Sequence, residues 1–139
     1  MTVIIQEEAT GCGIASVANI IERPYSEVKV KANKMGIFAD DDTLYSDTQY
    51  VRKLLKEYAV QASSNEISFS SWEALPNIAL LSIKYHEENG YPFWHWVVFK
   101  RKEEEAFVLD SAAYLKENKR TDFQNMHPKW FIEILKANE

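Results

Sequence analysis

The chain has 139 residues, a length typical of one domain with a single core. Its net charge of −5 at pH 7 disfavours nucleic-acid binding, which needs a concentrated basic face. No apolar run approaches the roughly 18–20 residues needed to cross a bilayer, and residues 1–8 lack the basic start of a signal peptide. We therefore expect a single domain over 1–139, with no nucleic-acid partner and no membrane segment.

Cysteine and histidine usage argues against metals and disulfides. Cys12 is the only cysteine, so an internal disulfide and a multi-cysteine metal site are excluded. This usage fits a reducing compartment, and we expect a cytoplasmic protein. The acidic run 40–42 lacks the glycine and glutamate of a calcium loop, and His86 and His127 match no zinc motif. We expect no metal, and without a glycine-rich phosphate loop we expect no nucleotide cofactor.

The first part of the chain predicts helices. Apolar residues recur at helical spacing over 12–22, directly after a glycine that suits an N-cap. A second helix is expected to start after Ser26 and to stop at Gly36, which suits the C-cap, and a third is expected over 47–58, beginning near an aspartate. A serine and a glutamate at capping-box spacing predict a short helix over 70–75. The segment 38–45 is expected to be a loop.

The second part is rich in β-forming residues. Residues 78–85 form a compact apolar run typical of a strand, and the polar segment 86–92 predicts a turn after it. Residues 93–100 and 106–110 flank the charged run 100–105. This arrangement favours an antiparallel hairpin with a solvated turn.

The end of the chain is expected to close the fold with a helix. A polar loop is predicted over 111–125, and Pro128 suits the first turn of a helix that buries Trp130 and Ile134. Helices therefore precede an antiparallel sheet and do not alternate with its strands. Such segregation indicates an α+β fold.

Cys12 is the most informative residue, because it stands in the first turn of the first predicted helix. The helix dipole and the free backbone N–H groups at this end favour a thiolate. Gly11 and Gly13 leave the thiol uncrowded and allow a substrate backbone to approach. The alternative for a lone cysteine is a small core residue. Its place at the helix end, away from the apolar stripe, favours a nucleophile.

Three further residues suit a cysteine nucleophile site. His95, in the aromatic strand, suits a general base, although an aromatic wall can also hold a structural histidine. Asp110 ends the partner strand and can orient the imidazole, or it can simply initiate a turn. Gln6 precedes Cys12 by a short segment and can help the Cys12 N–H to hold an oxyanion, or it can be a surface residue.

A family resemblance appears at four segments taken in order: Gln6, 11–16 (GCGIAS), 95–98 (HWVV) and 108–110 (VLD). Together they resemble the C39-like group of papain-fold cysteine peptidases, typified by bacteriocin-processing leader peptidases. The resemblance covers nearly the whole chain. It implies a papain-like α+β fold, with N-terminal helices packed on a C-terminal antiparallel sheet.

The same resemblance implies a cysteine peptidase-like hydrolase acting on a peptide or protein substrate through a thioester. It assigns the oxyanion hole to Gln6, the nucleophile to Cys12, the base to His95 and the orienting acid to Asp110. Many family members carry aspartate before the cysteine and proline after the aspartate, where this chain has glycine and serine. The alternatives are an acyltransferase or deamidase on the same site, a non-catalytic peptide-binding module, and a partner protein with a buried cysteine.

Overall fold

A computed structural model describes residues 3–136, apart from the side chains of residues 45, 46 and 136. The ends of the predicted domain, at residues 1 and 139, therefore lie outside the described residues. Within that range the helices come first: α1 (Cys12–Ile21), α2 (Tyr25–Lys34), the 3-10 helix η1 (Asp42–Ser46) and α3 (Gln49–Glu57).

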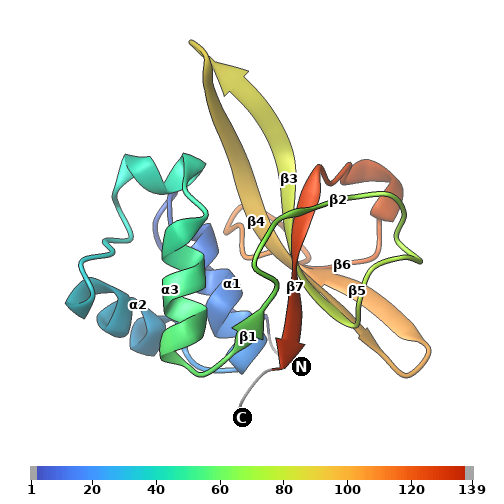
Figure 1. Ribbon diagram of the computed structural model, residues 1–139, viewed down its shortest axis with the longest axis horizontal. Coiled ribbons are helices and arrows are strands. Elements are labelled where there is room, and N and C mark those ends of the chain that lie inside the picture. The colour runs from blue at the N-terminus through green and yellow to red at the C-terminus, as the bar shows by residue number, and fades with distance from the viewer. Residues whose placement is uncertain (1–2, 137–139) are drawn as a thin grey trace.

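Strands follow the helices along the chain. They are β1 (Gln61–Ala62), β2 (Ile67–Ser68), β3 (Ile78–Glu88), β4 (Tyr91–Lys102), β5 (Glu105–Leu109), β6 (Lys119–Arg120) and β7 (Trp130–Lys136), with the 3-10 helix η2 (Phe123–Asn125) before β7. In the described range they form a seven-stranded antiparallel sheet of order β1-β7-β3-β4-β5-β6, with β2 also paired to β7. Figure 1 shows the three α-helices gathered on one side of this sheet, which confirms the α+β prediction.

The first and third predicted helices are confirmed with small shifts at their ends, and the second begins slightly earlier than expected, at Tyr25. The predicted loop over 38–45 runs into η1. None of the described helices has the length and apolarity needed to cross a bilayer.

The core has two apolar layers because successive strand residues point to opposite faces of the sheet. Trp96 and Val98 of β4 belong to the layer that contains the helices, whereas Val97 and Phe99 belong to the layer on the other face. Every residue of α1 is buried, and this helix contacts β4, α2 and α3. The N-terminal end of α1 is therefore held rigidly beside β4.

The helix predicted over 128–135 is wrong, because this segment forms β7. The strand pairs with β3 and also with the short strands β1 and β2. Ile132 and Ile134 pack into the helix-side layer, and Phe131 packs into the layer on the other face. The apolar residues thus serve the two faces of a buried strand, and their spacing resembled a helical stripe only by coincidence.

The short helix predicted over 70–75 is also wrong, because these residues form a turn. Arg101 of β4 donates hydrogen bonds to the carbonyl of Leu75 at 2.7 Å and to that of Trp72 at 3.0 Å. The Leu75 N–H also donates to the Trp72 carbonyl at 3.3 Å, so this segment forms a single turn that is held by a side chain from the sheet.

The hairpin of β3 and β4 is longer than the sequence predicted. Most of the expected turn over 86–92 belongs to the strands, and the reversal is confined to Asn89 and Gly90, whose φ angles are 52° and 82°. Asparagine and glycine tolerate this left-handed backbone. The hairpin projects beyond the rest of the sheet (Figure 1). The predicted hairpin of β4 and β5 is confirmed, but Lys100 is buried there and donates to the Asn19 carbonyl at 3.0 Å.

The N-terminal segment is ordered against α1. The Ile4 N–H donates to Asn19 Oδ1 at 2.8 Å, and Asn19 Nδ2 donates back to the Ile4 carbonyl at 3.1 Å. Asn19 is itself buried. This reciprocal pair places the residues that follow, including Gln6, next to the start of α1.

Candidate active site

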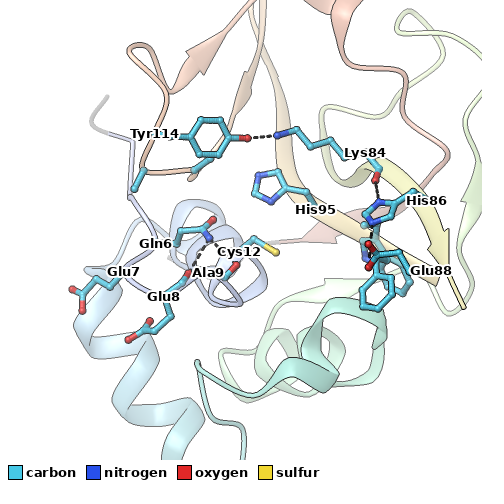
Figure 2. Close-up of a pocket in the computed structure, with 14 residues that line it drawn as sticks. Gln6, Glu7, Glu8, Ala9, Cys12, Lys84, His86, Glu88, His95 and Tyr114 are labelled. Atoms are coloured by element: carbon cyan, nitrogen blue, oxygen red, sulfur yellow. Dashed lines mark hydrogen bonds and ion pairs between the residues drawn. The ribbon is translucent and has the colours of Figure 1, made fainter. Parts of the chain in front are cut away.

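A cleft of about 560 Å³ opens where the N-terminal segment, the start of α1, the hairpin of β3 and β4 and the segment after β5 meet (Figure 2). Three of the four sequence-predicted residues line it, and the fourth, Asp110, is fully buried. The cleft is lined by Gln6, Glu7, Glu8, Ala9, Cys12, Lys84, His86, Glu88, Phe93, Trp94, His95, Ala112, Ala113 and Tyr114.

Cys12 is the first residue of α1 and lines the cleft although only 3% of it is exposed. The N-cap is Gly11, and no described side chain caps this helix end, so the positive end of the dipole is left uncapped at the cysteine. Figure 2 shows the Cys12 side chain on the same side of the cleft as His95, and interaction with Cys12 is one of the causes that raise the His95 pKa.

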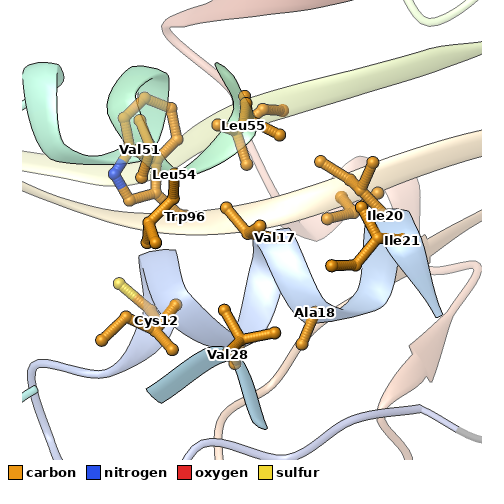
Figure 3. Packing of buried hydrophobic residues seen from close by; sticks show 14 of the residues in the cluster. Cys12, Val17, Ala18, Ile20, Ile21, Val28, Val51, Leu54, Leu55 and Trp96 are labelled. Atoms are coloured by element: carbon orange, nitrogen blue, oxygen red, sulfur yellow. The ribbon is translucent and has the colours of Figure 1, made fainter. Parts of the chain in front are cut away.

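The body of α1 anchors this cysteine through packing (Figure 3). Val17 and Ala18 of α1 belong to one buried cluster with Val28 of α2, Leu55 of α3 and Trp96 of β4. Each of these side chains is buried. Because the helix is enclosed by α2, α3 and β4, its first turn has little freedom to move relative to the strand that carries His95.

The glycines on either side of Cys12 make room for tyrosines. A Cβ atom at Gly13 would lie 2.6 Å from ring carbons of Tyr50, and one at Gly11 would press on the hydroxyl of Tyr25. Atoms cannot approach so closely without a shift of the ring or the helix. The glycines therefore serve the packing of the helix start, a role that the sequence did not reveal.

His95 and Asp110 form a buried ion pair. His95 Nε2 lies 2.7 Å from Asp110 Oδ1, which leaves Nδ1 as the ring nitrogen available to Cys12. Burial acts to lower the pKa of His95, but its hydrogen bonds to Asp110 and Cys12 raise it to about 10. Burial acts to raise the pKa of Asp110, but the hydrogen bond and charge of His95 hold it below its usual value. At neutral pH the pair is therefore an imidazolium and a carboxylate.

Arg120 of β6 is a third member of this network that the sequence did not single out. Its Nη1 lies 2.9 Å from Asp110 Oδ2. Its Nε and Nη2 donate to the two carboxylate oxygens of Asp122 at 2.9 and 2.7 Å. An arginine followed closely by an aspartate in a polar segment was the available signal, and it is weak because such pairs are common on surfaces.

The backbone after Asp110 is held by Asn118. Its Nδ2 donates to the carbonyl of Asp110 at 2.7 Å and to that of Ala112 at 2.8 Å, while the Ala112 N–H donates to Asp110 Oδ1 at 3.1 Å. These bonds keep the carboxylate pointed at the histidine and not along the loop.

Gln6 lies in the cleft but uses its amide within the protein. Its Oε1 accepts from Ser111 Oγ at 2.8 Å, and its Nε2 donates to the carbonyls of Glu8 and Ala9 at 2.9 and 3.2 Å. The residue is thus close to the start of α1, as expected. Its amide hydrogens are therefore already bonded to backbone carbonyls within the protein.

One wall of the cleft comes from the projecting hairpin. At Lys84 the register of β3 is interrupted by a bulge and φ is 55°, which turns this side chain toward Tyr114 (Figure 2). Lys84 Nζ donates to the Tyr114 hydroxyl and lies 4.9 Å from the ring centroid. This contact joins β3 to the segment after β5 near His95.

Comparisons with known proteins agree with the fold. No family model and no curated protein matches the sequence. Among solved structures, the chain is similar to a double-glycine motif protease from an AMS/PCAT transporter, crystallised in complex with the leader peptide. The TM-score is 0.60 at 20% sequence identity, over 96% of this chain and 89% of that chain. The chain therefore shares the α+β fold of this protease, which agrees with a C39-like resemblance at the level of the fold.

Proposed function

We propose that the protein is a cysteine peptidase-like hydrolase that cleaves a peptide or amide bond, with Cys12 as its nucleophile. The observation that carries this proposal is that one cleft is lined by both a thiol at a helix N-terminus and an imidazole held by a buried carboxylate. A core cysteine has no need of a charged histidine, whereas a thiolate nucleophile is activated by one.

The proposed reaction begins from the Cys12 thiolate and the His95 imidazolium. The sulfur attacks the substrate carbonyl carbon, and a C–S bond forms while the C=O electrons move to oxygen. The C–N bond then breaks as His95 gives its proton to the leaving amine, which leaves a thioester. Water attacks the thioester and loses a proton to His95, and the acid departs as the thiolate returns.

The charge state of the histidine supports this starting point. Burial opposes the charge, yet the bonds to Asp110 and Cys12 raise the His95 pKa to about 10, so the ring carries a proton to give at neutral pH. In our proposal Asp110 fixes the ring so that Nδ1 faces the sulfur.

We assign the oxyanion to the backbone N–H of Cys12 and to the Gln6 amide. The cysteine N–H lies at the uncapped start of α1, where the helix dipole favours negative charge. For Gln6 to contribute, its amide has to turn away from the carbonyls of Glu8 and Ala9 when substrate binds. In this rotation the Gln6 amide turns about its Oε1, which stays hydrogen-bonded to Ser111.

A peptide substrate suits the walls of the cleft. Phe93, Trp94 and Tyr114 line it beside backbone of the N-terminal segment, and a volume of about 560 Å³ accommodates several peptide side chains. The structurally similar protease was crystallised with a leader peptide, which supports a peptide ligand here. A reducing compartment such as the cytoplasm, predicted from the single cysteine, keeps such a thiol active.

A peptide library incubated in ¹⁸O-labelled water tests the proposal and separates its alternatives. Hydrolysis places one ¹⁸O atom in each new carboxyl group, which mass spectrometry detects. A transferase instead joins the acyl group to an added amine, and a deamidase releases ammonia without breaking the chain. Cys12→Ala should abolish every product. Peptides that bind without any Cys12-dependent product would contradict the proposal and identify a binding module.

A further inference from the structure

We propose that Arg120 is a positioning residue that holds the Asp110 carboxylate oriented and ionised for His95 throughout the reaction. This inference rests on the proposed function. It concerns a residue outside the cleft, since Arg120 contacts neither Cys12 nor the open space that a substrate would occupy.

The carboxylate of Asp110 is shared between the two cations. Oδ1 accepts from His95 Nε2 at 2.7 Å, and Oδ2 accepts from Arg120 Nη1 at 2.9 Å. Asp110 is completely buried, so no water shell replaces either partner if it is lost. Because both oxygens are hydrogen-bonded, the plane of the carboxylate is fixed. The direction of the hydrogen bond between Oδ1 and the imidazole is fixed with it.

Asp122 holds the guanidinium of Arg120 on the edge opposite Asp110. Asp122 accepts from Nε and Nη2 in a two-pronged pair, so Nη1 is the edge left for Asp110. Arg120 pairs in register with Val108 of β5, which places it beside the strand that leads into Asp110. Charges then alternate along Asp122, Arg120, Asp110 and His95, and each buried charge meets its opposite.

The proposed reaction explains why a second cation is needed. When His95 gives its proton to the leaving amine, Asp110 faces a neutral ring, and a buried carboxylate without a cation tends to take up a proton. A protonated Asp110 would no longer accept the Nε2–H bond that sets the ring. Arg120 keeps its charge at every working pH, so it preserves the carboxylate through that step.

Three variants separate a positioning role from a structural one. Arg120→Met removes the positive charge and keeps most of the side-chain length. Arg120→Lys keeps the charge but loses the planar guanidinium that donates to both aspartates. Lys119→Met is the matched control on the same short strand, because Lys119 contacts exposed Glu105 at 2.7 Å and not Asp110. The first readout is the proton NMR signal of His95 Nε2–H, and the second is the rate at which iodoacetamide alkylates Cys12.

We expect wild type and Lys119→Met to show a slowly exchanging Nε2–H signal and equal alkylation rates. Arg120→Met should lose the His95 Nε2–H signal, and its Cys12 should be alkylated at least about tenfold more slowly. Arg120→Lys should show a weaker signal and an intermediate alkylation rate. A folded Arg120→Met protein with the wild-type signal and rate overturns the inference. If Arg120→Met does not fold, Arg120→Lys and Asp122→Asn decide: a weakened signal in either supports the inference, and wild-type signals in both overturn it.

The outcomes also distinguish this inference from the proposed function. If the wild-type thiol shows no enhanced alkylation, the nucleophile assignment fails, while the Nε2–H signal still reports whether Arg120 positions Asp110. If the wild-type thiol is reactive and Arg120→Met matches it in both readouts, only the role of Arg120 fails.

Discussion

Ser111 Oγ donates a hydrogen bond to Gln6 Oε1 at 2.8 Å, and the Gln6 backbone N–H donates to the Ser111 carbonyl at 3.0 Å. These bonds tie the N-terminal segment to the residue that directly follows Asp110, although the two residues are 105 positions apart in sequence. Ser111 is almost fully buried. In the proposed site this pair sets the position of the Gln6 amide relative to Cys12.

Ser111→Ala should therefore weaken both the fold and the proposed oxyanion site. Loss of the hydroxyl leaves Gln6 Oε1 without its donor, and we expect the free energy of unfolding in urea to fall by about 1 kcal/mol. A peptide aldehyde, which forms an oxyanion on a thiol, should also bind more weakly. Ser16→Ala is the matched control, because the buried Ser16 hydroxyl donates only to the Trp96 carbonyl, at 3.3 Å. Equal aldehyde affinity in the two variants would refute the role of the Gln6–Ser111 pair.

Gly13→Ala should destabilise the protein more than Gly11→Ala. A Cβ at Gly13 meets ring carbons of the buried Tyr50 at 2.6 Å, whereas one at Gly11 meets chiefly the terminal hydroxyl of Tyr25. Because a buried ring cannot move aside easily, we expect a loss of about 1–3 kcal/mol for Gly13→Ala. Urea unfolding of both variants measures the difference. The reverse order of stabilities would show that Tyr50 does not constrain the start of α1.

Stability should depend on pH through His95. Burial opposes the charge on this ring, but Asp110 and Cys12 raise its pKa from 6.5 to about 10 in the folded protein. A raised pKa stabilises the fold fully below the unfolded value, and this stabilisation is lost as pH rises through the folded value.

The difference in unfolding free energy between wild type and His95→Gln should therefore shrink between about pH 6.5 and pH 10. We expect a change on the order of 1 kcal/mol or more, measured by urea unfolding at both ends of this range. Asp110→Asn removes the main partner and should flatten the same dependence. A difference that stays constant with pH would mean that the ring is not held as a cation.

Local signals in the sequence were sufficient to predict the first helix and the place of Cys12 at its start. Glycine before Cys12, followed by apolar residues at helical spacing, predicts both the start of α1 and the position of the thiol in its first turn. The hairpin of β4 and β5 also follows from a local pattern, and it is this hairpin that brings His95 toward Asp110. These parts could be predicted because neighbours in sequence determine them.

The rest depends on partners that are distant in sequence. The segment of β7 carries apolar residues for two layers, so its spacing alone does not separate strand from helix. The strands β1, β2 and β6 have two residues each, too few to show any period. Arg120 sits on one of these, and only the pairing of β6 with β5 brings it to Asp110. The engagement of the Gln6 amide likewise depends on Ser111, which is 105 positions away in sequence.

We propose that His95 holds Cys12 as a reactive thiolate. The most direct test is the rate of iodoacetamide alkylation of Cys12 as a function of pH, compared between wild type and His95→Gln. We expect wild type still to alkylate rapidly at about pH 6 and His95→Gln to be at least about tenfold slower there, while the two rates approach each other above about pH 9. Equal rates for both proteins at about pH 6 would contradict it.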